Sequence, residues 1–143
     1  MNEGEIATIA HAIELAVAPV FLLAAVGAIL NVMTIRLSRV IDRSRVLDGR
    51  RSAPAPDMEA IDGELRQLRR RGNLIHLAIA LCTGCALMVC SVIGIVFLGA
   101  MFGFAVGNAV FSLFVAAMVS LISALVLLLR EIQLAIALMQ FRH

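Results

Sequence analysis

The sequence predicts an all-α integral membrane protein with three transmembrane helices and a cytoplasmic antiparallel helical hairpin. The first observation is composition: 62% of the 143 residues are hydrophobic, and the mean hydropathy is +0.99. The second is a set of three long, almost uncharged runs, which predict transmembrane helices at 6–35, 74–100 and 106–130. Each run exceeds the roughly 20 helical residues that cross a bilayer core. Because the runs are continuously apolar and do not alternate between apolar and polar residues, helices are favoured over a β-barrel. We expect the whole chain, 1–143, to form a single membrane domain.

The distribution of arginine predicts the orientation of these helices. Ten of the twelve basic residues, all arginine, lie between positions 36 and 73, and Arg130 and Arg142 follow the third run. No basic residue precedes the first run or lies between the second and third runs. The positive-inside rule therefore predicts an N-terminus outside the membrane and a C-terminus in the cytoplasm.

The segment 36–73 is predicted to form the hairpin from extensions of the first two membrane helices. Gly49, followed by two prolines, marks a turn over 50–57. Apolar residues of the second arm recur at steps near three and four, which suits packing against the first arm. Acidic residues early in the second arm would face arginines late in the first, and such exposed pairs set register more than stability. Residues 131–143 are predicted to continue the third helix as a C-terminal helical tail.

A line of small and polar residues, here called the polar stripe, follows one face of the first span. Its steps alternate between three and four residues, which keeps its members on one helical face. Contact between polar groups and lipid chains is unfavourable, so the stripe should face protein or water. Two explanations stay open: the stripe packs against another helix, or it lines a water-filled path at the axis of an oligomer. The members of the stripe are Ala24, Gly27, Asn31, Thr34 and Ser38.

Charged residues near the ends of the spans are the other candidate site residues. His11 and Glu14 lie one turn apart and would form a cation-attracting outer mouth in an oligomer, whereas the plainer alternative places them in the headgroup zone. Arginines near the cytoplasmic ends would form a cytoplasmic mouth or a surface that attracts anionic lipid headgroups. These are Arg36, Arg39, Arg69, Arg70, Arg71 and Arg130.

The remaining chemistry-bearing residues do not predict an active site. Cys82 and Cys85 form a C-x-x-C pair, but no second pair exists, and cysteine in a membrane helix is usually a small packing residue. We therefore expect no metal site and no cofactor. The sequence contains no Gly-rich phosphate loop and no catalytic Ser-His-Asp arrangement, so we also expect no catalytic residues and no enzymatic activity.

Several motifs resemble those of a known family. They are APVFLL in the first span, N-x-x-T-x-R-L-x-R-V-x-D-R-x-R-x-L beginning at Asn31, and LREIQLA beginning at Leu129. With them, nearly the whole chain resembles an uncharacterised family of small bacterial inner-membrane proteins, a domain of unknown function with three transmembrane helices. The resemblance implies this topology and a location in the bacterial inner (plasma) membrane. It implies no substrate and no catalytic residue.

Together these features predict a homo-oligomeric membrane protein whose first helix lines an ion-conducting path. The alternative is a non-enzymatic structural or accessory subunit of a larger membrane complex, or a lipid-organising scaffold. The expected partners are the lipid bilayer, anionic lipid headgroups and further copies of the chain, with no role for nucleic acid.

Overall fold

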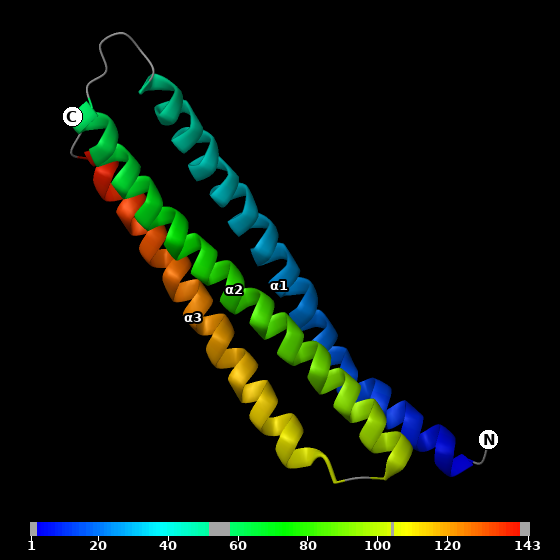
Figure 1. Ribbon diagram of the computed structural model, residues 1–143. Helices are drawn as coiled ribbons and strands as arrows, with labels where there is room; N and C mark the ends of the chain where they lie inside the picture. The colour runs from blue at the N-terminus through cyan, green and yellow to red at the C-terminus, as the bar shows by residue number, and fades with distance from the viewer. Residues whose placement is uncertain (1–2, 52–57, 104, 141–143) are drawn as a thin grey trace. The chain divides into compact units, whose positions relative to one another are not determined.

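The computed structural model describes residues 3–51, 58–103 and 105–140 (Figure 1). Over this part of the chain the fold consists of three helices. Their bounds are α1 Glu3–Arg50, α2 Met58–Phe102 and α3 Gly107–Gln140.

Each helix contains a stretch long and apolar enough to cross a membrane, as the composition predicts. The 48 residues of α1 extend about 70 Å at 1.5 Å per residue, more than twice a hydrocarbon core of about 30 Å. α1 and α2 therefore extend well beyond the apolar segments that they contain.

The helix ends follow local sequence signals. α2 stops at Gly103, which has a φ of 71° and donates its N–H to the Gly99 carbonyl at 2.9 Å. A glycine in this left-handed conformation is a common end of an α-helix. α1 ends at the predicted turn, where Arg51 N–H donates to the carbonyls of Leu47 and Asp48, both at 3.3 Å. Most of that turn, residues 52–57, lies outside the described residues, as do the last three residues of the predicted tail.

The helices contribute to two packed units, and each helix takes part in both. The first unit comprises residues 1–29 and 81–122. Its buried residues are mostly small, including Ala12, Val26, Cys82, Cys85 and Ala117. Within this unit, the Ser120 hydroxyl donates to the Leu81 carbonyl at 2.8 Å and joins α3 to α2. Small side chains and hydroxyl bonds of this kind are typical of close helix contacts in membranes.

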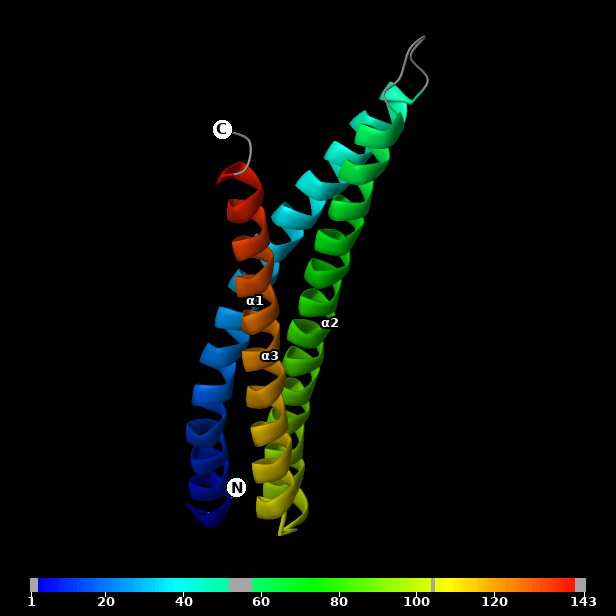
Figure 2. The ribbon, with the colours of Figure 1, turned by 90° about the vertical axis from the view of Figure 1, so that its left-hand side faces the viewer.

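The second unit comprises residues 30–80 and 123–143. Apart from Ala78, its described buried positions repeat every seven residues, a spacing that keeps them near one face of each helix. Arg43 pairs with Glu64, Arg51 pairs with Asp62, and Val40 lies beside Gly72, so the end of α1 and the start of α2 run antiparallel (Figure 2). The buried repeat positions are Met33, Val40 and Leu47 of α1, Ile61, Leu68 and Ile75 of α2, and Ala124 and Glu131 of α3.

Candidate functional site

Glu131 is the most unusual side chain of the second unit. It occupies a buried repeat position of α3, seven residues after Ala124, and only 1% of its surface is exposed. Every other described buried side chain of this unit is hydrophobic. A carboxylate in such a place is costly unless it is paired and hydrogen-bonded.

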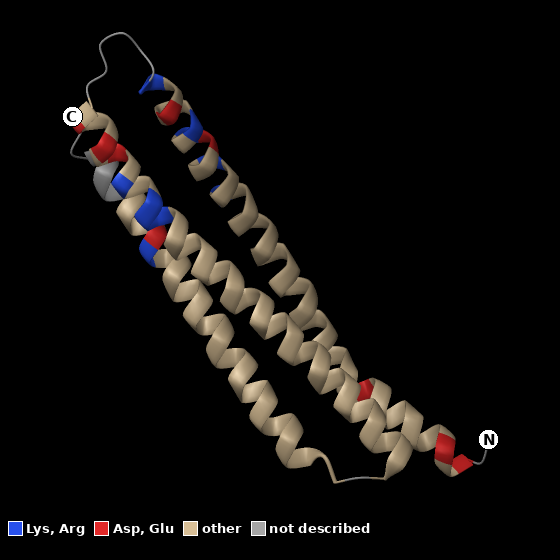
Figure 3. Cartoon of the chain, in the orientation of Figure 1, with Lys and Arg blue, Asp and Glu red and all other residues tan. Residues whose placement is uncertain are grey.

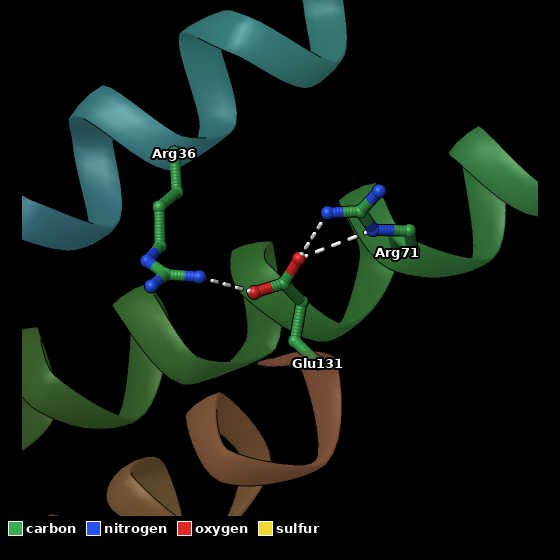
Figure 4. A network of polar contacts seen from close by, with 3 residues as sticks. All are labelled: Arg36, Arg71 and Glu131. Carbon is green, nitrogen blue, oxygen red and sulfur yellow. Dashed lines mark hydrogen bonds and ion pairs between the residues drawn. The ribbon is translucent and has the colours of Figure 1, made fainter. Parts of the chain in front are cut away.

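Two arginines from the other two helices supply that pairing (Figure 4). Arg71 of α2 donates from Nε and from a terminal nitrogen to Oε1 of Glu131, at 3.1 and 2.6 Å. Arg36 of α1 donates to Oε2 at 3.0 Å. We call these three residues the triad. Both carboxylate oxygens therefore accept charge-assisted hydrogen bonds, and all three helices meet at one side chain.

The two arginines remain partly accessible. The side chain of Arg36 is 37% exposed and that of Arg71 is 26% exposed, although the carboxylate between them is buried. One negative charge is shared by two positive charges, so the triad keeps a net positive charge. A guanidinium has five N–H donors, so Arg36 has donors left for another acceptor.

A groove of about 410 Å³ lies against the triad within the second unit. Its lining combines charged guanidinium groups with aliphatic side chains. The lining residues are Val32, Ile35, Arg36, Arg39, Val40, Arg43, Leu68, Arg71 and Glu131.

The structure separates the predicted cytoplasmic arginines into two groups. Arg36 and Arg71 are engaged with Glu131, whereas Arg39, Arg69, Arg70 and Arg130 are exposed. Figure 3 shows that basic residues gather on the end of α1, the start of α2 and the end of α3, all in the second unit. The prediction recognised the arginines as a group but not the carboxylate that two of them bind.

All members of the polar stripe are exposed on the surface of the single chain. The Thr34 hydroxyl donates to the Leu30 carbonyl at 2.8 Å, and the Ser38 hydroxyl donates to the Ile35 carbonyl at 2.9 Å. Met33 and Val40, which follow the stripe residues Asn31 and Ser38 by two positions, are buried. Residues two apart lie nearly opposite each other on a helix, so the stripe faces away from the packed seam.

His11 and Glu14 lie in the first unit, and both side chains are strongly exposed. His11 Nδ1 is 3.9 Å from Glu14 Oε2, a contact within one helical turn. The pair lies on α1 as its sequence spacing predicts.

The cysteine pair is part of the packing of the first unit. Cys82 and Cys85 are buried, and Cys90 is exposed. Across residues 3–51, 58–103 and 105–140, no group of three or more His, Cys, Asp or Glu residues is placed to hold a metal ion.

Sequence reasoning did not identify Glu131 as a site residue, although signals for it exist. It is the only acidic residue after Glu64, and it follows a long apolar run. It also continues the seven-residue spacing of Ala117 and Ala124. An acidic residue at a position that continues the buried repeat predicts a buried ion pair. It is weaker evidence for the start of a C-terminal tail.

Over the described residues the fold is all-α, and its three helices, each long and apolar enough to cross a membrane, indicate a membrane protein. The chain belongs to the family described as "Protein of unknown function (DUF2721)", which it matches over residues 16–141. The matched residues belong to both units and include Arg36, Arg71 and Glu131. No curated protein and no solved structure matches the chain.

Proposed function

We propose that the protein is a homo-oligomeric, non-enzymatic membrane protein whose α1 helices line an ion-conducting path. The observation that carries the proposal is the exposed polar stripe, which lies on the face of α1 opposite the packed seam. Asn31 in particular is exposed within the apolar run 6–35, where contact with lipid would be unfavourable. A neighbouring copy or water would remove that cost.

The hydrogen bonds of the stripe support a path for cations or water. Because Thr34 and Ser38 donate their hydroxyl protons to their own helix, their oxygen lone pairs are the groups that they present outward. Asn31 adds an amide oxygen on the same face. Oxygen ligands of this kind replace part of the hydration shell of a cation in a channel.

The low internal burial of the apolar segments supports an oligomer. In the most apolar window of each helix, only 17–22% of the residues are buried within the chain. Three helices enclose no path by themselves, so several copies would have to surround one. The remaining apolar surface is available to lipid and to neighbouring copies.

Flux measurements on the full chain in liposomes test the proposal. We expect the wild-type protein to conduct K⁺ or Na⁺ above the level of empty liposomes, and Asn31→Leu to abolish that flux. Val32→Leu is the matched control, because Val32 is exposed at the same depth but lies away from the stripe. The absence of flux in the wild type, or equal flux in both variants, would contradict the proposed path.

Disulfide cross-linking tests the oligomer independently of conduction. In a background in which all three cysteines are replaced by alanine, Thr34→Cys should give a homodimer band on oxidation, because its copies would face a common axis. Val32→Cys should give much less of it. A cross-linked product that contains another protein would favour the accessory-subunit alternative.

We further propose that the antiparallel ends of α1 and α2 form a cytoplasmic coiled-coil hairpin, with the N-terminus outside the bacterial inner membrane. The ten arginines between positions 36 and 73 support this orientation. In the same cysteine-free background, Arg45→Cys in intact cells should resist a membrane-impermeant maleimide, and Glu3→Cys should react. The reverse pattern would invert the topology.

A further inference from the structure

The groove beside the triad carries more positive than negative charge. Arg36, Arg39, Arg43 and Arg71 line it, while the acidic partners of these arginines are Glu131 and Glu64. Four arginines against two carboxylates leave an excess of two positive charges. In a partly enclosed groove such an excess favours an anion, because charges interact more strongly there than in bulk water.

Arg39 is the least engaged of these four arginines. It is exposed, and among the described residues it makes no hydrogen bond or ion pair. Arg36 donates to Glu131 from only one of its terminal nitrogens. The groove therefore offers a free guanidinium and part of a second one, and guanidinium groups bind phosphate oxygens in bidentate geometry.

The position of the groove along the helices indicates where such an anion would come from. Arg36 directly follows the apolar run 6–35, and Glu131 comes just after the run 106–130. Their hydrogen bond places both ends at one level. This level is the boundary between the apolar segments and the charged segments, where lipid phosphates lie in a bilayer.

Two of the four aliphatic residues that line the groove, Val32 and Ile35, belong to the apolar run 6–35. Val32 and Ile35 precede Arg36 and Arg39 by one helical turn, and they are 48% and 47% exposed. A ligand that binds the guanidinium groups through phosphate would therefore meet an apolar surface on its membrane side. A phospholipid has this arrangement of charge and apolar chain.

We propose that this groove is a binding site for the phosphate group of an anionic glycerophospholipid, with Arg39 and Arg36 as the phosphate ligands. This proposal requires that the chain lies in a membrane, but it does not require an ion path. No member of the polar stripe lines the groove. Its test is therefore independent of the flux experiment.

Native mass spectrometry of the full chain, delipidated in a non-ionic detergent, measures the binding. We expect phosphatidylglycerol to bind more tightly than phosphatidylcholine, and Arg39→Gln to weaken phosphatidylglycerol binding about fivefold, the effect of one arginine near an anionic surface. Arg70→Gln is the matched control. It removes the same charge beside Arg71, but Arg70 is exposed and does not line the groove.

Three outcomes would count against the site. Equal loss of binding in both variants would indicate general attraction to the arginine-rich surface, and equal affinity for the two lipids would exclude a phosphate site selective for anions. Competition by inorganic phosphate or glycerol 3-phosphate at concentrations below those of the lipid would overturn the lipid as source. Circular dichroism of each variant confirms that its helices are intact.

Discussion

Arg71 holds one oxygen of the buried Glu131 with two of its nitrogens, at 3.1 and 2.6 Å. The two residues are 60 positions apart, and the bond joins the start of α2 to the end of α3. Arg36, 95 positions from Glu131, holds the other oxygen. A single polar residue in an apolar seam often specifies helix register at some cost in stability, and we propose that Glu131 has this role here.

Glu131→Gln should destabilise the protein by about 1–3 kcal/mol, because it removes the charge that both arginines share while it keeps the side-chain size. The partial exposure of Arg36 and Arg71 limits the loss, since water solvates the released charges. Reversible unfolding in detergent, followed by circular dichroism, measures the change.

Arg130→Gln is the control for this substitution. It changes the charge of the neighbouring residue by one unit, but Arg130 is exposed. We expect its effect to stay below about 0.5 kcal/mol, as for most surface substitutions. If the two variants unfolded at the same denaturant concentration, the buried triad would have no special part in stability.

The membrane helices could be predicted from sequence, whereas the triad could not be predicted in full. Long apolar runs identify the spans because bilayer thickness sets their length, and the turn signals at Gly103 and after Gly49 mark where helices end. Arg36 and Arg71 were predicted as site residues from their place beside the runs. Their partner depends on the relative register of three helices, which no local pattern specifies.

The orientation of the polar stripe shows the same limit. Sequence spacing predicts that Asn31, Thr34 and Ser38 share one face of α1. The spacing does not show whether that face is buried against another helix of the same chain or exposed on its surface. The buried positions of Met33 and Val40 supply this answer, because they place the seam on the opposite side.

Ser120→Ala should destabilise the first unit by about 0.6 kcal/mol, the average for interhelical hydrogen bonds in a membrane protein. The Ser120 hydroxyl is the donor to the Leu81 carbonyl, so the variant leaves a carbonyl of α2 without this bond. Ser112→Ala is the control, because the Ser112 hydroxyl donates to the Ala109 carbonyl of its own helix. Thermal unfolding in detergent compares the two variants, and a larger loss for Ser112→Ala would contradict the assignment.

Gly72→Ala should stabilise the protein, whereas Gly103→Ala should destabilise it. A Cβ added at Gly72 would lie 3.7 Å from Cγ1 of Val40, which is ordinary van der Waals contact between α2 and α1. Alanine also favours a helix interior by about 0.5–1 kcal/mol relative to glycine. At Gly103, the φ of 71° makes any side chain unfavourable by about 1–2 kcal/mol. Unfolding of both variants under the same conditions should therefore move in opposite directions. A loss of stability in Gly72→Ala would mean that α1 and α2 approach each other more closely at Val40 than this contact allows.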